Sequence, residues 1–464
     1  MTTIETDYLV VGAGASALAF ADALLSKADV EVVIVDRRSR PGGHWNDAYP
    51  FVRLHQPSAS YGVNSQILGN DTIDRTGPNA GLYERASGVE ICEYFGQVLE
   101  HKLLGSGRVR FFPMCDYIGD RAGVHAFASR LSGTTTDVNV RRRVVDTTYL
   151  ECSVPATHSP SFTSDSDAVV IPVGDLTSLA AAPSGFTILG SGKTAMDACT
   201  WLLDNAVDPD QIRWARPREP WMVDRSSVQP LDLLGSTIEG FATSVEALAG
   251  AESKPDLFAE LESCGQLMRL DPTAEATMFR GAIVSRSECD DLRQIERVVR
   301  HGHVTHIGTD RIVMSSGEVP TTRGELHIDC TARGLGTAAV RPIFEEGRIT
   351  LQSLMGGFTT YNAALIGFVE ASRDDDIEKN RLCPPTAPPT VPVDLISFYR
   401  SALLTTALHG AEPDLAIFQD EARLSLTRGL SARLGEPQVL AAVERWMTSA
   451  DDALRNADRL LGSA

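Results

Sequence analysis

Two glycine-rich turns constrain the fold of this chain more than any other feature of its sequence. The first spans residues 12–17 after an apolar run at residues 8–11, and the second spans residues 190–195 after an apolar run at residues 186–189. Both turns read Gly-x-Gly-x-x-Ala, and apolar residues at helical spacing follow each of them. The order of strand, glycine turn and helix is typical of Rossmann-like units that bind nucleotides. The sequence therefore predicts an α/β fold with two Rossmann-like dinucleotide-binding domains.

The first turn offers a chemical role for each of its residues. Gly12 permits the tight turn, Gly14 lets backbone N–H groups approach a pyrophosphate at the helix N-terminus, and Ala17 allows the helix to pack closely on the strand. Asp36 follows the next apolar run, at residues 30–35, where a carboxylate accepts hydrogen bonds from ribose hydroxyls. This pattern favours an adenosine ribose without a 2′-phosphate. The competing interpretation is an ordinary glycine turn between a strand and a helix.

The second turn differs in the residues that would contact the ribose. No carboxylate ends the next predicted strand, at residues 212–215, and Arg216 and Arg218 follow it instead. Two guanidinium groups suit a ribose with a 2′-phosphate, so the sequence favours NADPH over NADH; the competing interpretation is a pair of solvated surface charges. A P-loop ATPase would need glycine at position 187, which is Thr187. The residues expected to hold the second nucleotide are Gly190, Gly192, Lys193, Thr194, Ala195, Arg216 and Arg218.

Composition and charge argue against several classes of protein. With 464 residues, 43% of them hydrophobic, the chain can bury more than one core, and its formal net charge of −19 disfavours binding to nucleic acid or to an anionic membrane. Its 8 cysteines are scattered without a Cys-x-x-Cys pair, which argues against a zinc site, a dithiol redox centre or a disulfide framework. The sequence shows no secretory signal and no run of about 20 apolar residues. We therefore expect a cytoplasmic protein without a bound metal.

The order of these patterns predicts one nucleotide-binding domain that is interrupted by another. The first domain is expected over residues 1–180 and the second over residues 181–335, with a helical insertion at about residues 226–300. A segment over residues 336–392 would return to the first domain, and a helical region would follow over residues 393–464.

Two further patterns make more local predictions. The apolar runs at residues 312–314 and 326–328 are expected to pair as strands and to close the second domain. Near the C-terminus four residues are spaced to form one apolar stripe on a helix, namely Leu440, Val443, Trp446 and Met447. That stripe is expected to pack against the body of the protein or against a partner subunit, which leaves a homodimer open.

The two turns and the segments around them resemble the single-component FAD- and NADPH-dependent monooxygenases, the class that includes flavin-containing and Baeyer-Villiger monooxygenases. The segments that carry the resemblance are Gly12 to Ala17, Asp36-Arg37, Arg40-Pro-Gly-Gly43-His-Trp45, Tyr49-Pro50, Arg53-Leu54-His55-Gln56-Pro57 with Tyr61, and Gly190 to Ala195. The F-x-G-x-x-x-H fingerprint expected before the second turn is absent, which indicates a divergent branch. The resemblance implies that the first domain binds FAD and that the inserted domain binds NADPH.

The resemblance also implies which residues contact FAD. Asp329 lies in a strand expected to return the chain to the FAD domain, and Gly356 and Gly357 lead into a helix that is expected to face the flavin pyrimidine. Trp45, Tyr49 and Tyr61 are expected either to stack around the flavin or to be core aromatics. The residues expected to hold FAD are Gly12, Gly14, Ala17, Asp36, Arg37, Gly43, Trp45, Leu54, His55, Gln56, Asp329 and Asn362.

The activity implied by the resemblance is a monooxygenase that consumes NADPH and inserts one oxygen atom of O2 into a small organic substrate. The reaction would proceed through a flavin C4a-(hydro)peroxide, as a Baeyer-Villiger or a nitrogen or sulfur oxygenation. The candidate catalytic or positioning residues are His55, Gln56, Tyr61, Asn64 and Lys193, and the pocket walls are expected to include Trp221, Met222 and residues 231–270. Two alternatives stay open: an FAD- and NAD(P)H-dependent dehydrogenase or reductase without oxygen insertion, and a binding protein that keeps the nucleotide folds without turnover.

Overall fold

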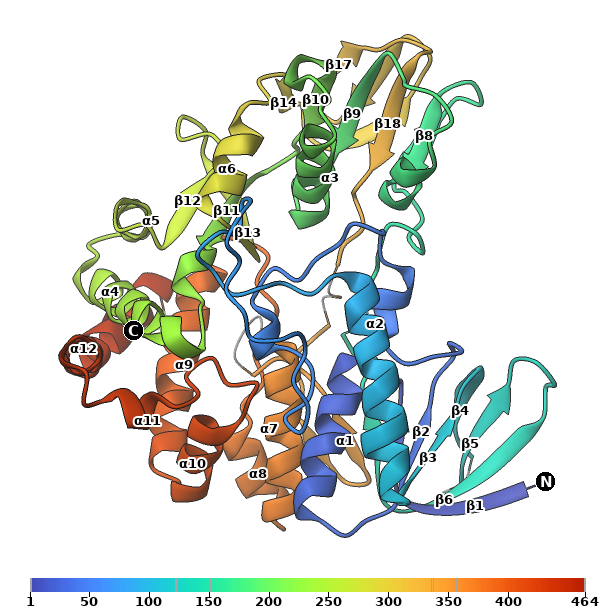
Figure 1. Ribbon diagram of the computed structural model, residues 1–464, viewed down its shortest axis with the longest axis vertical. Helices are drawn as coiled ribbons and strands as arrows, with labels where there is room; N and C mark the ends of the chain where they lie inside the picture. The colour runs from blue at the N-terminus through green and yellow to red at the C-terminus, as the bar shows by residue number, and fades with distance from the viewer. Residues whose placement is uncertain are drawn as a thin grey trace.

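The computed structural model describes residues 2–121, 124–150, 152–334, 336, 338–354 and 358–462, so the predicted Gly356 and Gly357 lie outside the described residues. The chain forms two lobes, each built around a parallel sheet, and a cluster of helices that lies beside them (Figure 1). The lobe at the bottom of Figure 1 carries the first glycine turn, and the lobe at the top carries the second. The predicted α/β fold with two Rossmann-like domains and C-terminal helices is confirmed.

The first lobe contains a sheet of 8 strands in the order β19-β20-β6-β1-β2-β3, with β4 and β5 joined through β6. The strands from β20 to β3 are parallel, and β2 is buried along its whole length, as expected of a strand covered on both faces. The bounds of the strands are β1 (Thr2–Val11), β2 (Val32–Val35), β3 (Val109–Phe112), β4 (Cys115–Arg121), β5 (Val124–Ser129), β6 (Thr135–Asp146), β19 (Phe344–Glu345) and β20 (Arg348–Thr350).

Two long helices, α1 (Ala15–Lys27) and α7 (Thr359–Ser372), pack side by side in this lobe (Figure 1). A Cβ on Gly367 would lie 2.5 Å from the carbonyl oxygen of Phe20, so α7 needs glycine there to approach α1 this closely. Helices α2 (Gly88–Gln97) and α8 (Asp376–Leu382) complete the lobe. The contact brings the N-terminal half of α7, which includes Asn362, into the core that contains the first glycine turn.

The second lobe is a parallel sheet of 5 strands in the order β14-β10-β9-β18-β8. Its strands are β8 (Val169–Pro172), β9 (Gly185–Leu189), β10 (Ile212–Ala215), β14 (Val298–Val299) and β18 (Glu325–Asp329), and helix α3 (Lys193–Asp204) follows the second glycine turn. Since β8 pairs with β18, the second sheet begins upstream of the predicted boundary at residue 181.

The predicted strand pair at residues 312–314 and 326–328 is wrong. Residues 312–314 lie in β16, which pairs with its neighbours along the chain in a separate sheet of 4 strands, whereas residues 326–328 lie in β18 between β9 and β8. Tight turns on both sides of β16 favour pairing with adjacent strands, and the fully buried β18 fits the middle of the parallel sheet. The small sheet consists of β7 (Thr163–Ser164), β15 (Val304–Ile307), β16 (Arg311–Met314) and β17 (Gly317–Pro320).

The insertion expected to be helical at residues 226–300 also contains strands. Helices α4 (Leu234–Gly250), α5 (Lys254–Ser263) and α6 (Arg286–Arg293) are present, and β12 (Leu267–Arg269) and β13 (Ala276–Val284) lie on either side of β11 (Glu219–Asp224). The buried strand β11 needs hydrogen-bonding partners at both edges, and the insertion supplies them. Apolar runs this short do not distinguish strands from buried helix segments, which explains the error.

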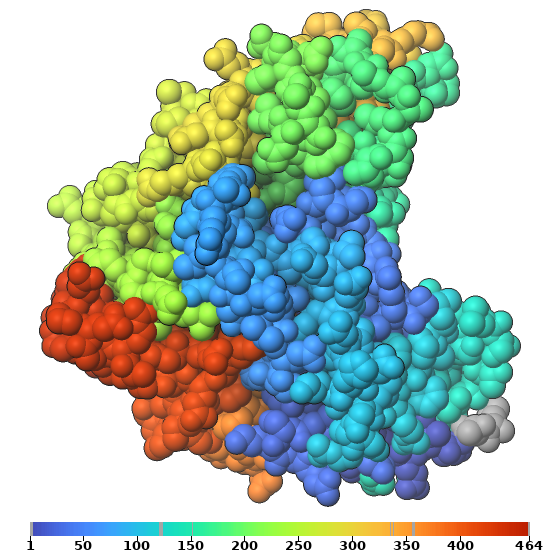
Figure 2. Space-filling model, in the orientation of Figure 1, coloured from blue at the N-terminus to red at the C-terminus, as the bar shows by residue number. Residues whose placement is uncertain are grey.

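The C-terminal region is helical, as predicted, and consists of α9 (Asp394–Gly410), α10 (Pro413–Glu421), α11 (Leu430–Arg433) and α12 (Pro437–Leu461). Helix α12 packs along α4, and Figure 2 shows the red C-terminal helices against the light-green insertion. Of the predicted stripe, Val443 and Trp446 are partly buried, but Leu440 and Met447 are 42% and 73% exposed. The buried face is rotated toward small residues such as Ala442, which allow the two helices to approach closely.

None of the helices in the described ranges combines the length and the apolar character that a bilayer crossing requires. Within the same ranges, no three His, Cys, Asp or Glu side chains come together in an arrangement that could hold a metal ion.

Candidate nucleotide-binding sites

The first glycine turn is held by contacts that a side chain would break. Gly12 has a φ of +102°, and a Cβ there would lie 2.5 Å from Oγ1 of Thr147. Asp36 is 5% exposed, and its two carboxylate oxygens accept hydrogen bonds from the N–H groups of Ala13 and Arg38, each at 2.6 Å. The carboxylate therefore lies against the turn, and each oxygen keeps a lone pair for a hydroxyl group.

A second pair of glycines packs directly against this turn. Gly42, with a φ of +115°, donates its N–H to the carbonyl oxygen of Ala13 at 2.9 Å. A Cβ on Gly43 would lie 3.0 Å from Cα of Gly14, so the two segments meet backbone to backbone. Helix α1 begins after Gly14 without a side-chain cap, which leaves its first N–H groups open to an anion. This glycine-lined corner can accept a pyrophosphate that a side chain would exclude.

The predicted aromatic group divides between two places. The indole N–H of Trp45 donates to the hydroxyl oxygen of Tyr61 at 2.8 Å, and the two rings meet edge-on with centroids 6.0 Å apart. Tyr49 lies elsewhere, against Phe51, and donates its hydroxyl to Asp197 of α3 at 2.5 Å. The three aromatics therefore do not form one stack, because the hydroxyl of Tyr49 is drawn to a carboxylate of the second lobe. Burial raises the pKa of Tyr61, which keeps its hydroxyl protonated.

The predicted residues after Arg53 serve mainly to hold their own segment. Gln56 donates to the carbonyl oxygen of Ser60 at 3.3 Å, and Oδ1 of Asn64 accepts the N–H of Leu424 at 3.2 Å. Asn64 therefore connects the C-terminal region to this segment. Its Oδ1 atom is used in that bond and does not face an open space. Of the other predicted FAD contacts, Ala17, Leu54 and Asn362 are buried, and Arg37 is exposed.

His55 lies beside a group of buried charges at the boundary between the lobes. Burial, reinforced by the positive charge of Lys193, lowers the pKa of His55 to about 3. The imidazole is therefore neutral at physiological pH, and can donate or accept a hydrogen bond without acting as an imidazolium acid. Its backbone carbonyl oxygen accepts a hydrogen bond from Nε of Arg225 at 2.9 Å.

Arg225 belongs to a buried ion cluster that links the lobes. Arg225 is fully buried and pairs with Glu288 of α6, and Arg85 lies 3.3 Å from the same carboxylate. Burial alone would raise the pKa of Glu288, but Lys193, Arg225 and Arg85 outweigh it and lower the pKa to about 2. A polar pocket of about 380 Å³, lined by residues of both lobes, opens beside this cluster. Apart from Lys193, which lies in the second glycine turn, the members of the cluster come from segments without a motif, so sequence reasoning missed it.

The second glycine turn repeats the geometry of the first. Gly190 has a φ of +127°, and a Cβ there would lie 2.8 Å from the carbonyl oxygen of Cys330. Helix α3 begins after Gly192 without a side-chain cap, and Ala195 is fully buried, as the close packing of the helix requires. Lys193 is buried and pairs with Asp197 one turn along α3. The lysine therefore contributes to the charge cluster between the lobes and is not extended toward the turn.

Asp329 does not lie in the first lobe. It ends β18, the strand beside β9 in the second sheet, and only the residues after it lead toward the first lobe. Its Oδ1 accepts hydrogen bonds from the N–H of Thr331 at 2.9 Å and from the hydroxyl of Thr331 at 2.6 Å, and Oδ2 lies 3.8 Å from Nε2 of His158. The buried strand that ends at Asp329 completes the parallel sheet of the second lobe, and the next strands along the chain, β19 and β20, belong to the first sheet, so the chain returns to the first lobe after this strand as expected.

The two predicted arginines have different surroundings. Arg216 is buried, lies over the ring of Trp214 at 4.9 Å, and has Nε 3.3 Å from the carboxylate of Glu219. Arg300 pairs both with Glu219 at 2.6 Å and with Asp271 at 2.7 Å, so two arginines and two carboxylates meet here and the charge of Arg216 is largely compensated. Arg218 is half-buried, and its N–H bonds the hydroxyl of Ser191 in the glycine turn at 3.3 Å.

Arg218 belongs to a cluster of three arginines at the second turn, which we call the arginine cluster: Arg218, Arg280 and Arg333. Arg280 donates to the carbonyl oxygen of Arg333 at 2.6 Å, and burial together with the charges of Arg218 and Arg333 lowers the pKa of Arg280. Among the residues that the structure describes, none of the three has a carboxylate within ion-pair distance. Three like charges without a counter-ion, one of them on a residue whose backbone bonds the second glycine turn, form a site for an anion.

Comparisons with known proteins agree with this geometry. Residues 10–65, which include the first turn, match the family described as NAD(P)-binding Rossmann-like domain. The polycyclic ketone monooxygenase of the thermophilic fungus Thermothelomyces thermophila has a similar fold, with a TM-score of 0.50 and 12% identity over 97% of this chain and 89% of that one.

Two mycobacterial proteins are much more similar in sequence. The uncharacterized protein Rv2000 of Mycobacterium tuberculosis (strain H37Rv) and the uncharacterized protein Mb2023 of Mycobacterium bovis are each 43% identical to this chain over 433 residues. The matched region covers 92% of this chain and 79% of each relative. An NAD(P)-binding Rossmann-like domain thus opens a chain with two nucleotide-type lobes, and the protein belongs to the same family as these two mycobacterial proteins.

Proposed function

We propose that the protein is an FAD-dependent oxidoreductase that consumes NADPH and inserts one oxygen atom of O2 into a small organic molecule. The observation that supports it most is the contrast between the two glycine turns, since a buried carboxylate lies at the first and the arginine cluster lies at the second. A carboxylate suits a free ribose, and uncompensated arginines suit a ribose that carries a phosphate dianion. Two different dinucleotides in one chain match this contrast better than two copies of one.

The first lobe fits FAD. FAD and NAD(P) share the adenosine diphosphate half that a Rossmann turn holds, so the turn alone does not separate them. The contact between Gly14 and Gly43 provides a corner without side chains for the pyrophosphate, and Asp36 lies where it can bond the ribose. Trp45 and Tyr61, which are joined by a hydrogen bond, offer aromatic surface that a flavin could contact.

The second lobe fits NADPH. The open N-terminus of α3 would hold the pyrophosphate, and the arginine cluster would hold the 2′-phosphate. Arg218 connects the cluster to the turn, since its backbone N–H donates to the hydroxyl of Ser191. We assign the phosphate to this cluster and a supporting role to Arg216, whose guanidinium is already paired with Glu219.

When bound, FAD would supply the redox and oxygen chemistry, and NADPH would supply the hydride. The residues of the chain would position the reactants and exclude water. His55, which is neutral at physiological pH, can donate or accept a hydrogen bond at the boundary between the lobes. Tyr61 stays protonated, and its hydrogen bond with Trp45 fixes its position. The buried cluster of Arg225, Glu288 and Arg85 would hold the two lobes in register while the nucleotides meet.

Isotope labelling tests this proposal. The purified protein is supplied with NADPH, a panel of small ketones, amines and sulfides, and ¹⁸O2, and products are analysed by mass spectrometry. We expect one ¹⁸O atom in the product. Oxidation of NADPH with release of hydrogen peroxide alone, or with electron transfer to an added acceptor alone, would indicate the dehydrogenase or reductase instead. A protein that holds no nucleotide would contradict both.

A further inference from the structure

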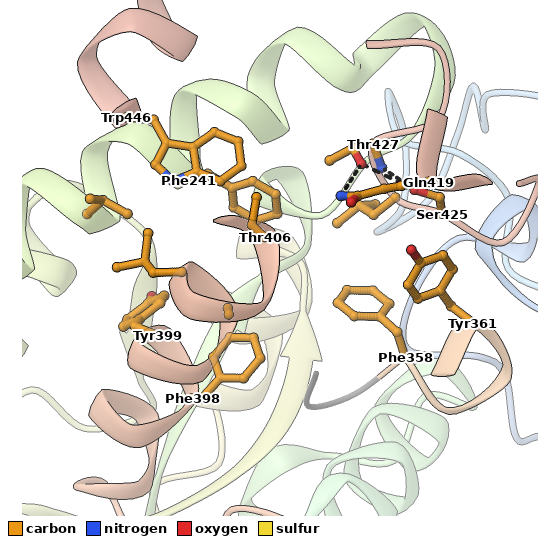
Figure 3. Close-up of a pocket in the computed structure, with 14 residues that line it drawn as sticks. Phe241, Phe358, Tyr361, Phe398, Tyr399, Thr406, Gln419, Ser425, Thr427 and Trp446 are labelled. Carbon is orange, nitrogen blue, oxygen red and sulfur yellow. Dashed lines mark hydrogen bonds between the residues drawn. The ribbon is translucent and has the colours of Figure 1, made fainter. Parts of the chain in front are cut away.

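A cavity of about 120 Å³ lies between the helical cluster and the first lobe. Its walls come from α4, the start of α7, α9, the segment from α10 to Thr427, and α12 (Figure 3). Trp221 and Met222, which the sequence suggested as pocket walls, are instead buried in the core, where Trp221 stacks on Phe258 at 5.5 Å. Of the residues predicted to line a pocket, only Phe241 and Val245 of α4 line this cavity.

The cavity is largely apolar, and most of its polar groups lie at one end. Aromatic rings dominate the other walls, and Phe241 and Trp446 meet edge-on with centroids 6.0 Å apart. None of the described residues that line it carries a charge. At the polar end Gln419 donates to Oγ1 of Thr427 at 3.3 Å, and the hydroxyls of Ser425 and Thr427 lie 3.2 Å apart, so these groups already bond one another (Figure 3).

Tyr361 is the exception at this end. Its side chain is 4% exposed, and its hydroxyl oxygen has no hydrogen-bond partner among the described residues. In Figure 3 the hydroxyl points toward the interior of the cavity and toward the group that contains Ser425. Burial raises the pKa of Tyr361, so the group stays protonated and remains a donor. A buried donor without an acceptor is unfavourable, which indicates that an acceptor enters from the cavity.

The cavity borders the proposed FAD site through two continuous pieces of chain. Asn362, which is expected to face the flavin, directly follows Tyr361 in the first turn of α7. On the opposite side, the guanidinium of Arg423 donates to the carbonyl oxygens of Ala59 and Val63, each at 2.8 Å, and to that of Tyr61. The segment that forms the polar end of the cavity is therefore fastened to the segment that carries Tyr61.

We propose that this cavity binds a small apolar molecule, about one six-membered ring in size, with a single hydrogen-bond acceptor, such as a carbonyl oxygen, that Tyr361 contacts. The volume sets the size, because an apolar cavity of roughly 150 Å³ holds one benzene molecule. The absence of charge among the described lining residues disfavours ionised ligands, and the one unpaired donor calls for one acceptor. The claim that the bound molecule is the substrate rests on the proposed function. The claim that the cavity binds such a molecule does not, because binding can be measured without turnover.

Ligand-observed NMR on the full-length protein, without NADPH, tests the proposal with two probes of equal size. Cyclohexanone carries the carbonyl oxygen, and methylenecyclohexane has a CH2 group in its place. Tyr361→Phe is expected to weaken cyclohexanone binding about fivefold, the effect of one neutral hydrogen bond, and to change methylenecyclohexane binding less than about twofold. Tyr399→Phe is the matched control, because Tyr399 lines the same cavity and, unlike that of Tyr361, its hydroxyl is not among the buried polar groups without a partner in the described residues.

A second variant keeps the test independent of the hydrogen bond. Ala402→Phe places a ring in the cavity and is expected to abolish binding of both probes, with the thermal midpoint of each variant confirming that the protein is folded. The proposal is overturned if cyclohexanone shows no saturable binding, if Tyr361→Phe weakens both probes equally, or if Ala402→Phe leaves binding unchanged. Binding through Tyr361 without incorporation of ¹⁸O would refute only the monooxygenase, and oxygenation without such binding would refute only this cavity as the site.

Discussion

Replacing Arg218 by glutamine is expected to remove the preference of the protein for NADPH over NADH. Arg218 is half-buried beside the second glycine turn, and it lies close to Arg280 and Arg333 without a carboxylate partner among the described residues. Glutamine keeps a polar side chain of moderate length and removes the charge. Only the coenzyme with a 2′-phosphate should respond to this change.

The size of the effect follows from the exposure of the arginine cluster. Two unit charges about 4 Å apart interact by about 4 kcal/mol at an effective dielectric constant of about 20, and by about 1 kcal/mol in bulk water. Arg218 lies between these limits, whereas Arg280 and Arg333 are exposed and screened by solvent. We therefore expect a loss of about 2 kcal/mol for Arg218→Gln, which corresponds to roughly 30-fold weaker binding of NADPH. The affinity for NADH should change less than about twofold.

Coenzyme fluorescence titrations of the wild type and the variant measure both affinities. Arg216→Gln is the control, because Glu219 compensates Arg216, and its loss should affect NADPH and NADH alike. Raising the salt concentration should narrow the difference between the two coenzymes in the wild type and hardly change it in Arg218→Gln. Equal weakening of both coenzymes by Arg218→Gln, or a loss confined to NADPH in Arg216→Gln, would refute the assignment of the phosphate to the arginine cluster.

Three further predictions concern the first site, the pH dependence and the boundary between the lobes. Gly43→Val should purify with less than a tenth of the wild-type flavin, because the facing backbone of Gly14 leaves no room for a side chain. The control Gly250→Ala, where a Cβ meets open space, should keep the wild-type flavin content. Full flavin content in Gly43→Val would contradict the assignment of the pyrophosphate to the glycine-lined corner. The free energy of unfolding should fall as the pH drops from 6.5 toward 3, because His55 takes up a proton in the unfolded chain but stays neutral in the folded one. In urea titrations at pH 5.5, His55→Gln should remove about 1 kcal/mol of this loss. If the free energy of unfolding of His55→Gln depends on pH as that of the wild type does, the lowered pKa of His55 is contradicted. Arg225→Met should lower the free energy of unfolding by about 3–5 kcal/mol, because it leaves Glu288 buried without its nearest partner. Adding Glu288→Gln to this variant should restore part of the lost stability. A double variant as unstable as Arg225→Met would show that the buried charge of Glu288 is not the cause.

The sequence predicted the parts of the fold that local patterns determine. Strand β10 has the predicted bounds, and both glycine turns join a strand to a helix as expected, because tight turns and apolar periodicity depend on neighbouring residues. The same locality explains the errors. Residues 312–314 and 326–328 carry similar apolar runs, and nothing within either run shows that they enter different sheets.

The candidate sites were predictable only where a motif marks them. Asp36 and Gly190 stand at fixed spacings from their strands, whereas Arg280 and Arg333 come from segments that meet only in the folded chain. Tyr361 gave no signal of its own, since a buried tyrosine is ordinary in a helix and becomes informative only when its hydroxyl is found unpaired beside a cavity. Convergence of distant side chains is a tertiary property that a single sequence does not express.

The central claim is that one chain binds FAD in the first lobe and NADPH in the second. It is tested most directly by the absorption spectrum of the purified protein, recorded without oxygen before and after addition of one equivalent of NADPH or NADH. We expect one FAD per chain and loss of the flavin absorption with NADPH, much faster than with NADH. A protein that stays colourless after incubation with FAD, or a bound flavin that NADPH leaves oxidised, would contradict it.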